Sequence, residues 1–340
     1  MARLRRVFVI LIFLFFANYT WACEDSLTEL ALRNIRQLTF SNMGFFKAGE
    51  AYFSPDDKSI IFQAVPHGES SYQIFIMKLD NIQARMVSTG QGACTCPYFR
   101  PDGQKIIFAS SHEDPRDACD RCQQVSGYQR DGGDCKWQFL PYTNIYEANI
   151  DGSELRALTK GKAYHAECAY SHDGSHIVFA SNLDGCMNIY TMSSDGDNIQ
   201  QVTRKKHGYS GGSFFSPDSK QIIYRADYKQ RDFLQIYIIN IDGTNRKKIT
   251  NNNHVNWAPF WHPNNKIIAY TTSCHGHDRY EIYLLNIHTG QEYRLTNSPG
   301  FDGIPAFSND GTKILWTSKC SEDKSCQVFI ADLILPQELL

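Results

Sequence analysis

Carboxylate, imidazole and amide side chains recur at a fixed distance before six copies of one short phrase in this 340-residue chain. The residues seven positions before the turn of each phrase are Ala48, Cys94, His165, Ser210, Asn256 and Asp302. Those five positions before it are Glu50, Cys96, Glu167, Gly212, Ala258 and Ile304. Carboxylate and amide oxygens suit calcium, and an added imidazole suits zinc or manganese. No cofactor is required by the sequence, but calcium or a transition metal could bind where these groups converge.

The alternative for these polar residues is hydrogen bonding to loop backbone and solvent around a water-filled channel. Aromatic residues directly precede some of them, which favours a binding surface of some kind. We expect a binding set at one channel mouth, consisting of Glu50, Tyr164, His165, Glu167, Tyr209, Ser210, Asn256 and Asp302. No residue is assigned a catalytic role.

The segment Gly208–Gly212 matches G-x-S-x-G, which would make Ser210 a nucleophile. That elbow must follow a strand and open a helix. Here it follows the basic run Arg204–His207 and opens an expected strand at Ser213–Phe215. The motif is therefore interpreted as a loop between repeats, and the chain carries no convincing nucleophile motif.

Eleven cysteines favour an oxidising compartment. Cys320 and Cys326 flank one loop and are expected to pair, and Cys168 could pair with Cys186. The full set of disulfide candidates is Cys94, Cys96, Cys119, Cys122, Cys135, Cys168, Cys186, Cys320 and Cys326. The C-x-C and C-x-x-C spacings also permit a zinc site, which stays the alternative to disulfides.

The elements that must position these residues are repeated hairpins, of which Ser213–Tyr224 is the clearest copy. A short apolar strand leads into a Ser-Pro-Asp turn and then into a second apolar strand, which is a hairpin signal. The turn positions are Pro55, Pro101, His172, Pro217, Pro263 and Asn309. Their intervals are 46, 71, 45, 46 and 46 residues. A strand-rich period of this length predicts an all-β fold, a six-bladed β-propeller with four-stranded antiparallel blades.

Each repeat continues with a third strand, a tight turn and a fourth strand ending in Leu-Thr or its equivalent. The last repeat lacks a fourth strand, and Ile35–Thr39 matches one, so the N-terminal strand should close the last blade and remove an exposed edge. We expect a propeller over 35–340, after an N-terminal segment at 23–34. The expected blades are 45–89, 90–159 with an insertion at 111–142, 160–203, 204–250, 251–296, and 297–333 closed by 35–39.

The N-terminus has the pattern of a signal peptide at 1–22, with Arg3, Arg5 and Arg6 before the apolar run Val7–Ala17. We therefore expect a periplasmic or secreted protein. Cys23 would be the site of a lipid anchor if the chain is a lipoprotein, which is the only membrane attachment considered. A net charge of -2 gives no reason to expect nucleic acid as a partner.

The phrases F-S-P-D-x-x-x-I-I-F/Y, I-Y-x-x-x-x-D-G and L-T resemble the WD-like repeats of the TolB-type six-bladed propeller family, over about Ile35 to Leu333. The resemblance implies periplasmic protein–protein interaction, or a propeller that gates a serine peptidase. The repeats leave no residues for a peptidase domain. We therefore expect a monomeric module that binds a protein or peptide. The alternative is a metal-dependent lyase or hydrolase acting on a polar or acidic substrate, such as an oligosaccharide, at the channel mouth.

Overall fold

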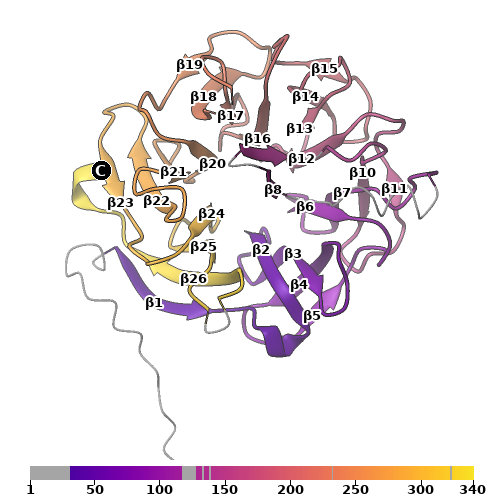
Figure 1. The fold of residues 1–340 in the computed structure, drawn as a ribbon, viewed down its shortest axis with the longest axis horizontal. Coiled ribbons are helices and arrows are strands. Elements are labelled where there is room, and N and C mark those ends of the chain that lie inside the picture. The colour runs from indigo at the N-terminus through magenta and orange to yellow at the C-terminus, as the bar shows by residue number, and fades with distance from the viewer. Residues whose placement is uncertain (1–30, 117–127, 132–133, 138, 232, 322–323) are drawn as a thin grey trace, which may run out of the picture.

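Six four-stranded antiparallel sheets stand around a central axis like the blades of a propeller (Figure 1). The computed structural model describes residues 31–116, 128–131, 134–137, 139–231, 233–321 and 324–340. The predicted signal peptide and the lipidation site at Cys23 lie outside the described residues. Among the described residues, no helix has the length and apolar character that crossing a membrane requires.

The first three blades follow the chain from its N-terminal part. Blade 1 contains β2 (Phe45–Phe53), β3 (Ser59–Pro66), β4 (Gln73–Lys78) and β5 (Ala84–Met86). Blade 2 contains β6 (Cys94–Phe99), β7 (Lys105–Ser110), β10 (Asn144–Asn149) and β11 (Arg156–Ala157). Blade 3 contains β12 (His165–Tyr170), β13 (His176–Ser181), β14 (Asn188–Ser193) and β15 (Gln200–Gln201).

The other three blades complete the ring. Blade 4 contains β16 (Ser210–Phe215), β17 (Gln221–Ala226), β18 (Gln235–Asn240) and β19 (Lys247–Lys248). Blade 5 contains β20 (Asn256–Trp261), β21 (Ile267–Thr272), β22 (Glu281–Asn286) and β23 (Glu292–Arg294). Blade 6 contains β24 (Asp302–Phe307), β25 (Lys313–Ser318), β26 (Gln327–Leu333) and β1 (Leu32–Gln37). The described helices are two short 3₁₀ turns, Ser41–Met43 and Gln337–Leu339.

Each Ser-Pro-Asp phrase forms its turn through its own side chains. In blade 1, Ser54 Oγ donates to Asp56 Oδ1 at 2.6 Å and accepts the Ser59 N–H at 2.9 Å. The same two contacts recur in blades 3, 4 and 6, where His172, Pro217 and Asn309 occupy the proline position. The serine and aspartate therefore define the turn, which explains why proline can be replaced there.

The Leu-Thr ending has an equally specific role in every blade. Its hydroxyl accepts the first interior N–H of the third strand, as when Thr159 Oγ1 accepts the Ile145 N–H at 2.9 Å. The apolar residue before it then donates its own N–H to the same strand residue, as Leu158 does to the Ile145 carbonyl. A serine, Ser88, performs this role in blade 1. The short fourth strands are thus joined to the blades by a hydroxyl as well as by backbone bonds.

The predicted closure of the last blade is confirmed. β1 pairs antiparallel with β26, and Leu38 N donates to the Val328 carbonyl at 2.8 Å. Thr39 Oγ1 accepts the Val328 N–H at 2.8 Å. The strand begins at Leu32, earlier than the expected Ile35. The two ends of the chain therefore share one blade, which closes the ring.

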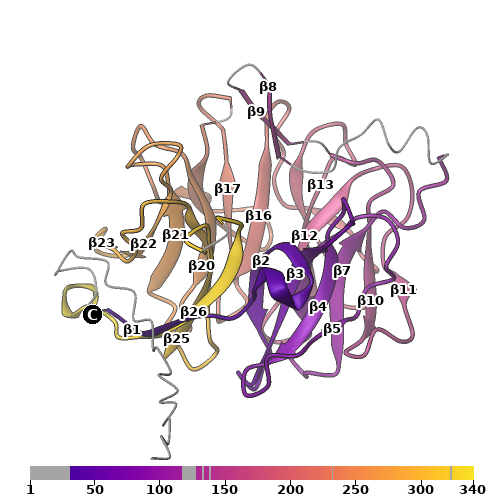
Figure 2. The ribbon, with the colours of Figure 1, turned by 60° about the horizontal axis from the view of Figure 1, so that its bottom comes forward.

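Two sides of the ring differ in construction. The tight turns lie on one side, here called the turn side, and the loops between blades and between second and third strands lie on the other, the loop side. The blade 2 insertion contains a hairpin, β8 (Tyr128–Asp131) and β9 (Asp134–Trp137), which we had not predicted. Figures 1 and 2 show this hairpin standing on the loop side near the centre of the ring.

Candidate functional site: the loop-side end of the channel

The innermost strand of every blade contains a β-bulge at the same position. The pairing register shifts there in all six blades. The bulged residues have φ between 48° and 57°, and we call them the bulge ring: Glu50, Cys96, Glu167, Gly212, Ala258 and Ile304. Such φ values are unusual for alanine and isoleucine. Since all six blades share them, the propeller imposes this backbone conformation whatever the side chain.

A layer of aromatic rings closes the channel just beyond the bulge ring. Tyr52, Tyr98, Phe214 and Phe260 each stand two residues after a bulge, and we call them the aromatic plug. Their ring centroids lie 4.8 to 6.0 Å apart, with Tyr52 contacting the other three. Ala169 and Ala306 occupy the same level in the other two blades. These rings pack across the axis of the propeller at this level, between the loop-side and turn-side ends of the channel.

Glu167 is the centre of a hydrogen-bonded charge network on the loop side of the plug. Its carboxylate accepts the Tyr209 hydroxyl at 2.6 and 2.7 Å and the Gly212 N–H at 2.6 Å. Arg225 Nη2 lies 2.9 Å from Glu167 Oε1 and 2.8 Å from the Tyr209 hydroxyl. The Arg225 and Glu167 side chains are only 8% and 14% exposed. Both members of the ion pair are thus largely removed from water, and both oxygens of the carboxylate are used.

The guanidinium of Arg225 is further held by aromatic faces. It lies 5.3 Å from the ring centroid of Tyr209 and 5.7 Å from that of Trp257, which are cation–π distances. Arg225 therefore bridges three successive blades, with Glu167 in blade 3 and Trp257 in blade 5. Its Nε is buried without a hydrogen-bond partner, so one N–H donor of the guanidinium is unused.

Two adjacent glycines in the G-x-S-x-G phrase, Gly211 and Gly212, leave the space that this network occupies. A Cβ on Gly211 would lie 2.2 Å from both Glu167 Oε2 and the Tyr209 hydroxyl. One on Gly212 would lie 1.7 Å from Arg225 Nη1. Ser210 itself is fully buried at the start of β16. The two glycines thus leave space for the ion pair. The burial of Ser210 is consistent with the prediction that this serine is not a nucleophile.

Glu50 is the second carboxylate of the bulge ring, and it lacks a comparable partner. Its carboxyl has two neutral hydrogen-bonding neighbours, the Cys96 thiol and the Tyr52 hydroxyl, and the latter lies 3.4 Å from Oε1. The side chain is half-buried. Burial, reinforced by the negative charge of Glu167, raises the pKa of the Glu50 carboxyl to about 7, although Arg225 acts in the opposite direction. The loop-side channel therefore holds two carboxylates against one guanidinium.

This elevated pKa predicts how Glu50 affects stability. The unfolded chain ionises Glu50 near pH 4.5, whereas the folded protein keeps the proton up to about pH 7. The unfavourable contribution of Glu50 therefore builds up between these two pH values and is complete above about 7. Glu50→Gln should therefore stabilise the protein at pH 8 by up to about 3 kcal/mol, and hardly at pH 5. Urea unfolding at both pH values measures this difference. The exposed Glu69→Gln is the control, and an equal effect of Glu50→Gln at both pH values would contradict the assignment.

The other predicted ring, seven residues before each turn, does not line the channel. Its backbone connects the blades, because each residue donates its N–H to a carbonyl of the preceding blade; for example, Asp302 donates to Tyr280 at 2.9 Å. Its six side chains are 0 to 3% exposed. The expectation that His165, Ser210, Asn256 and Asp302 meet at the mouth is therefore wrong, since each is enclosed in its own blade.

Burial changes the titration of two of these residues. It lowers the pKa of His165 to about 4 and raises that of Asp302 to about 6. His165 Nδ1 and Asp302 Oδ1 have no hydrogen-bond partner.

Of the predicted set, the structure brings together Glu50, Tyr164, Glu167 and Tyr209. It adds Arg225, which the sequence analysis did not select. The sequence does mark this residue, because the equivalent position in the second strand of every other blade is uncharged: Gln63, Ala109, Ala180, Thr271 and Thr317.

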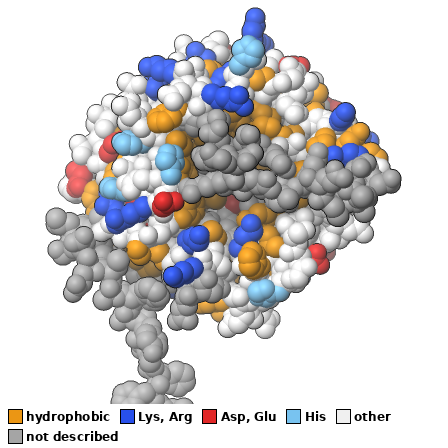
Figure 3. Space-filling model, in the orientation of Figure 1, with side chains coloured by type: hydrophobic (Ala, Val, Ile, Leu, Met, Phe, Trp, Pro, Cys, Tyr) orange, Lys and Arg blue, Asp and Glu red, His pale blue; other side chains and the backbone are white. Residues whose placement is uncertain are grey.

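The blade 2 insertion returns over this end of the channel. Phe139, which follows the hairpin, stacks on Tyr209 with ring centroids 6.1 Å apart and contacts Tyr164 at 5.2 Å. Figure 3 views the loop side and shows Lys and Arg side chains spread around its rim. Exposed basic residues of the loops of blades 2 to 4 include Lys160, Lys162, Arg204, Lys206 and Lys229. A basic rim thus surrounds a centre that has one carboxylate in excess.

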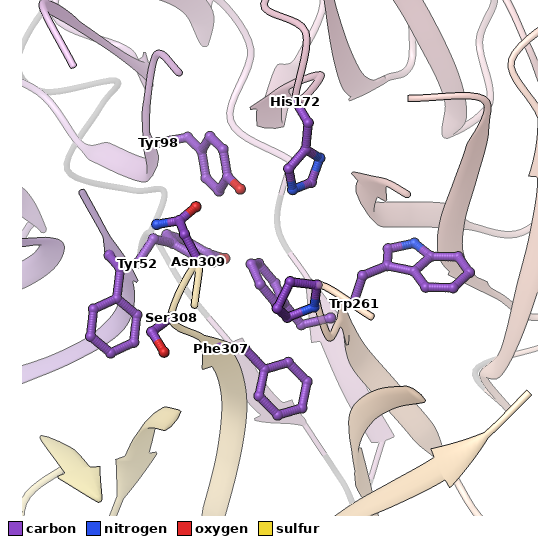
Figure 4. Close-up of a pocket in the computed structure, with 10 residues that line it drawn as sticks. Tyr52, Tyr98, His172, Trp261, Phe307, Ser308 and Asn309 are labelled. Carbon is purple, nitrogen blue, oxygen red and sulfur yellow. The ribbon is translucent and has the colours of Figure 1, made fainter. Parts of the chain in front are cut away.

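A separate pocket opens at the turn-side end of the channel. Figure 4 shows Tyr98 and His172 on one side of it and Phe307 and Ser308 on the other, with Asn309 between them. Tyr52, Tyr98 and Phe260 of the plug also line it. Asn309 is engaged by the neighbouring turn, since its Nδ2 donates to Asp57 Oδ1 at 2.7 Å. The polar groups on this side therefore serve the contact between turns.

Only some of the cysteines predicted to form disulfides lie among the described residues. Cys119 and Cys122 lie outside them, and for Cys135 in β9 only the backbone is described. Cys94, Cys96, Cys168, Cys186, Cys320 and Cys326 are free thiols in the structure. Cys168 Sγ contacts the Cys96 carbonyl, whereas Cys186 Sγ contacts that of Gly208. The disulfide pairings stay predictions, which non-reducing peptide mapping would test.

The residues present do not fit a divalent cation at the loop-side channel. Glu167 already accepts hydrogen bonds from three groups, one of them a guanidinium that would repel a metal ion. Across the ranges that the structure describes, no three His, Cys, Asp or Glu side chains are grouped as metal ligands. The sequence leaves calcium or a transition metal possible at this mouth, and the contacts of Glu167 give that possibility no support.

Comparison with known proteins identifies the repeats. The family model described as the TolB beta propeller domain matches residues 214–334. TolB from Acinetobacter baumannii superposes with a TM-score of 0.58 at 18% identity, over 85% of this chain and 64% of that one. Residues 214–334 thus match the TolB propeller domain, and the whole ring has the fold of a six-bladed β-propeller.

Two curated proteins match this chain over short segments. A Tol-Pal system protein TolB of Francisella tularensis is 33% identical over 84 residues, which are 25% of this chain and 19% of that protein. Dipeptidyl-peptidase 5 of Porphyromonas endodontalis is 34% identical over 87 residues, 26% of this chain and 12% of the enzyme. The matches therefore span less than a quarter of these relatives.

One enzyme structure is similar in fold alone. An oligogalacturonate lyase in complex with manganese superposes with a TM-score of 0.56 at 16% identity, over 86% of this chain and 78% of the lyase. At this identity the likeness concerns the propeller and not its chemistry.

Proposed function

We propose that this TolB-type propeller is an exported module that binds a protein or peptide through its loop side, at the end of the channel. One observation carries the proposal. The turns, the Leu-Thr contacts and the bulges are repeated around the ring and serve the scaffold. Glu50, Glu167, Tyr209 and Arg225 instead occupy positions where most of the other blades carry different residues. Residues that depart from a repeated pattern and converge on one place are candidates for binding.

The surroundings of this network suit a protein partner. The loop-side loops carry a two-stranded hairpin and a basic rim, which would steer an acidic partner surface toward the channel. The plug prevents passage through the ring, so a bound segment must enter and leave on the loop side. Export rests on the signal-peptide pattern, and the Tol-Pal relative supports a periplasmic location.

The alternative, a metal-dependent lyase or hydrolase, has the fold of the manganese-bound lyase in its favour. The ion pair between Glu167 and Arg225 argues against it, because it occupies the carboxylate that a metal would need. Metal analysis of the purified protein separates the two functions. Stoichiometric manganese or zinc that depends on Glu50 or Glu167 would favour the enzyme.

Peptides selected from a random phage-displayed library on the parent protein test the binding site. Ile304→Trp should fill the loop-side channel, because Ile304 belongs to the bulge ring and keeps some exposed surface. The selected peptides should bind this variant at least about tenfold more weakly, a change of ~1.4 kcal/mol. Lys220→Trp adds the same side chain on the turn side and should leave binding unchanged. Binding lost only in Lys220→Trp would place the site on the turn side and refute the proposal.

A further inference from the structure

We propose that the loop-side channel binds a primary ammonium group of its partner, a lysine side chain or a peptide N-terminus, through Glu50. This inference rests on the proposed function and specifies the chemistry that the site recognises. Its basis is the imbalance of charge between Glu50, Glu167 and Arg225, together with the aromatic surroundings of Glu50.

The charge count in the channel leaves Glu50 without a counter-ion. Arg225 and Glu167 neutralise each other at 2.9 Å. A second carboxylate in a place of low polarity must either bind a proton or be paired with a cation. The protein supplies Glu50 with two neutral contacts, the Cys96 thiol and the Tyr52 hydroxyl at 3.4 Å, and neither carries a positive charge. A ligand that brings a positive charge would replace the proton and release Glu50 from an unfavourable state.

The groups around Glu50 select an organic cation. The aromatic residue in direct contact with the Glu50 carboxyl is Tyr52, which belongs to the aromatic plug and packs on Tyr98, Phe214 and Phe260. Aromatic faces stabilise ammonium groups by cation–π interaction. Arg225 faces the same space and disfavours a second cation, but its charge is already balanced by Glu167 and shared with Tyr209 and Trp257.

An ammonium fits this place better than a metal ion or a guanidinium. A divalent cation needs several oxygen ligands, and Glu50 offers one carboxylate that is not already paired with a charged group. A guanidinium presents a wide planar fork, whereas an ammonium is a compact charge on a slender stem. Phe139 and Tyr164 narrow the approach from the loop side. The basic rim further implies that the ammonium is presented by a segment that is not itself strongly basic.

Calorimetric titration with n-butylammonium chloride at 0.15 M salt tests this inference with a defined probe. At pH 8 the parent protein should bind it, and the neutral n-pentanol should bind at least tenfold more weakly. Glu50→Gln should weaken butylammonium binding at least tenfold, whereas Glu69→Gln, exposed on the same blade, should stay within twofold. Glu50→Asp keeps the charge and should retain part of the affinity, which guards against a misfolded variant.

The pH dependence is a second readout. A carboxyl that titrates near pH 7 is about 90% ionised at pH 8 and about 10% at pH 6, so butylammonium should bind about tenfold more weakly at pH 6. Nα-acetyl-lysine methylamide and alanyl-alanine amide then separate the two sources of ammonium, the side chain and the N-terminus. Equal binding of butylammonium by the parent and Glu50→Gln, or none by the parent, would overturn the inference. Peptides that bind the parent but not Ile304→Trp would still support the proposed function.

Discussion

Replacing Arg225 by methionine is expected to destabilise the protein by about 3–5 kcal/mol, the cost of leaving one partner of a buried ion pair uncompensated. Glu167 would keep the Tyr209 and Gly212 contacts but lose the guanidinium at 2.9 Å. The cation–π contacts to Tyr209 and Trp257 would disappear as well. Urea unfolding at pH 7 measures the change.

Two comparisons separate this effect from the loss of any arginine. Arg156→Met removes a guanidinium that also pairs with a buried glutamate, Glu147, but is itself 50% exposed. That variant should lose no more than ~1 kcal/mol. The double variant Glu167→Met, Arg225→Met should cost clearly less than the sum of its single changes, since each removes the other's partner. Additive costs would show that the two side chains do not form an energetic unit.

Shortening Leu38 to alanine is expected to cost ~2–5 kcal/mol, because this residue holds the closing strand against the last blade. Leu38 is 1% exposed and packs in a cluster with Val328 and Ile330 of β26. Its N–H also donates to the Val328 carbonyl. Thermal unfolding and size-exclusion chromatography report the loss, since an open blade exposes a strand edge that favours association.

Ile35→Ala is the matched control for the closing strand. Ile35 lies on the same strand with its side chain 52% exposed, so its truncation should stay within about 0.5 kcal/mol. If Leu38→Ala unfolded like the parent, the N-terminal strand would be dispensable for the ring.

The scaffold of this protein is readable from its sequence because each contact is encoded locally and repeated. The serine and aspartate of a turn bond within five residues of each other, and the Leu-Thr ending bonds to its own blade. The closing strand was also predictable, since Leu38 and Thr39 repeat the Leu-Thr phrase at the opposite end of the chain.

The site was less predictable because one bulge decides which side chains face the channel. Strand alternation alone would place the side chains of His165 and Glu167 on the same face, because they are two residues apart. The structure encloses His165 in its blade, whereas Glu167 reaches Tyr209 and Arg225 of the next blade. The aromatic plug was missed for a similar reason: Tyr52 and Phe260 read as ordinary strand residues until the ring brings them to 5.8 Å.

The titration of the Glu50 carboxyl carbon, followed by NMR in the parent and assigned with Glu50→Gln, tests the central claim most directly. That claim is an excess carboxylate at the loop-side end of a plugged channel. The account predicts one glutamate with a pKa of about 7, absent from the variant, and a fall of at least one unit when butylammonium saturates the protein. A Glu50 pKa close to 4.5 that does not respond to the amine would contradict it.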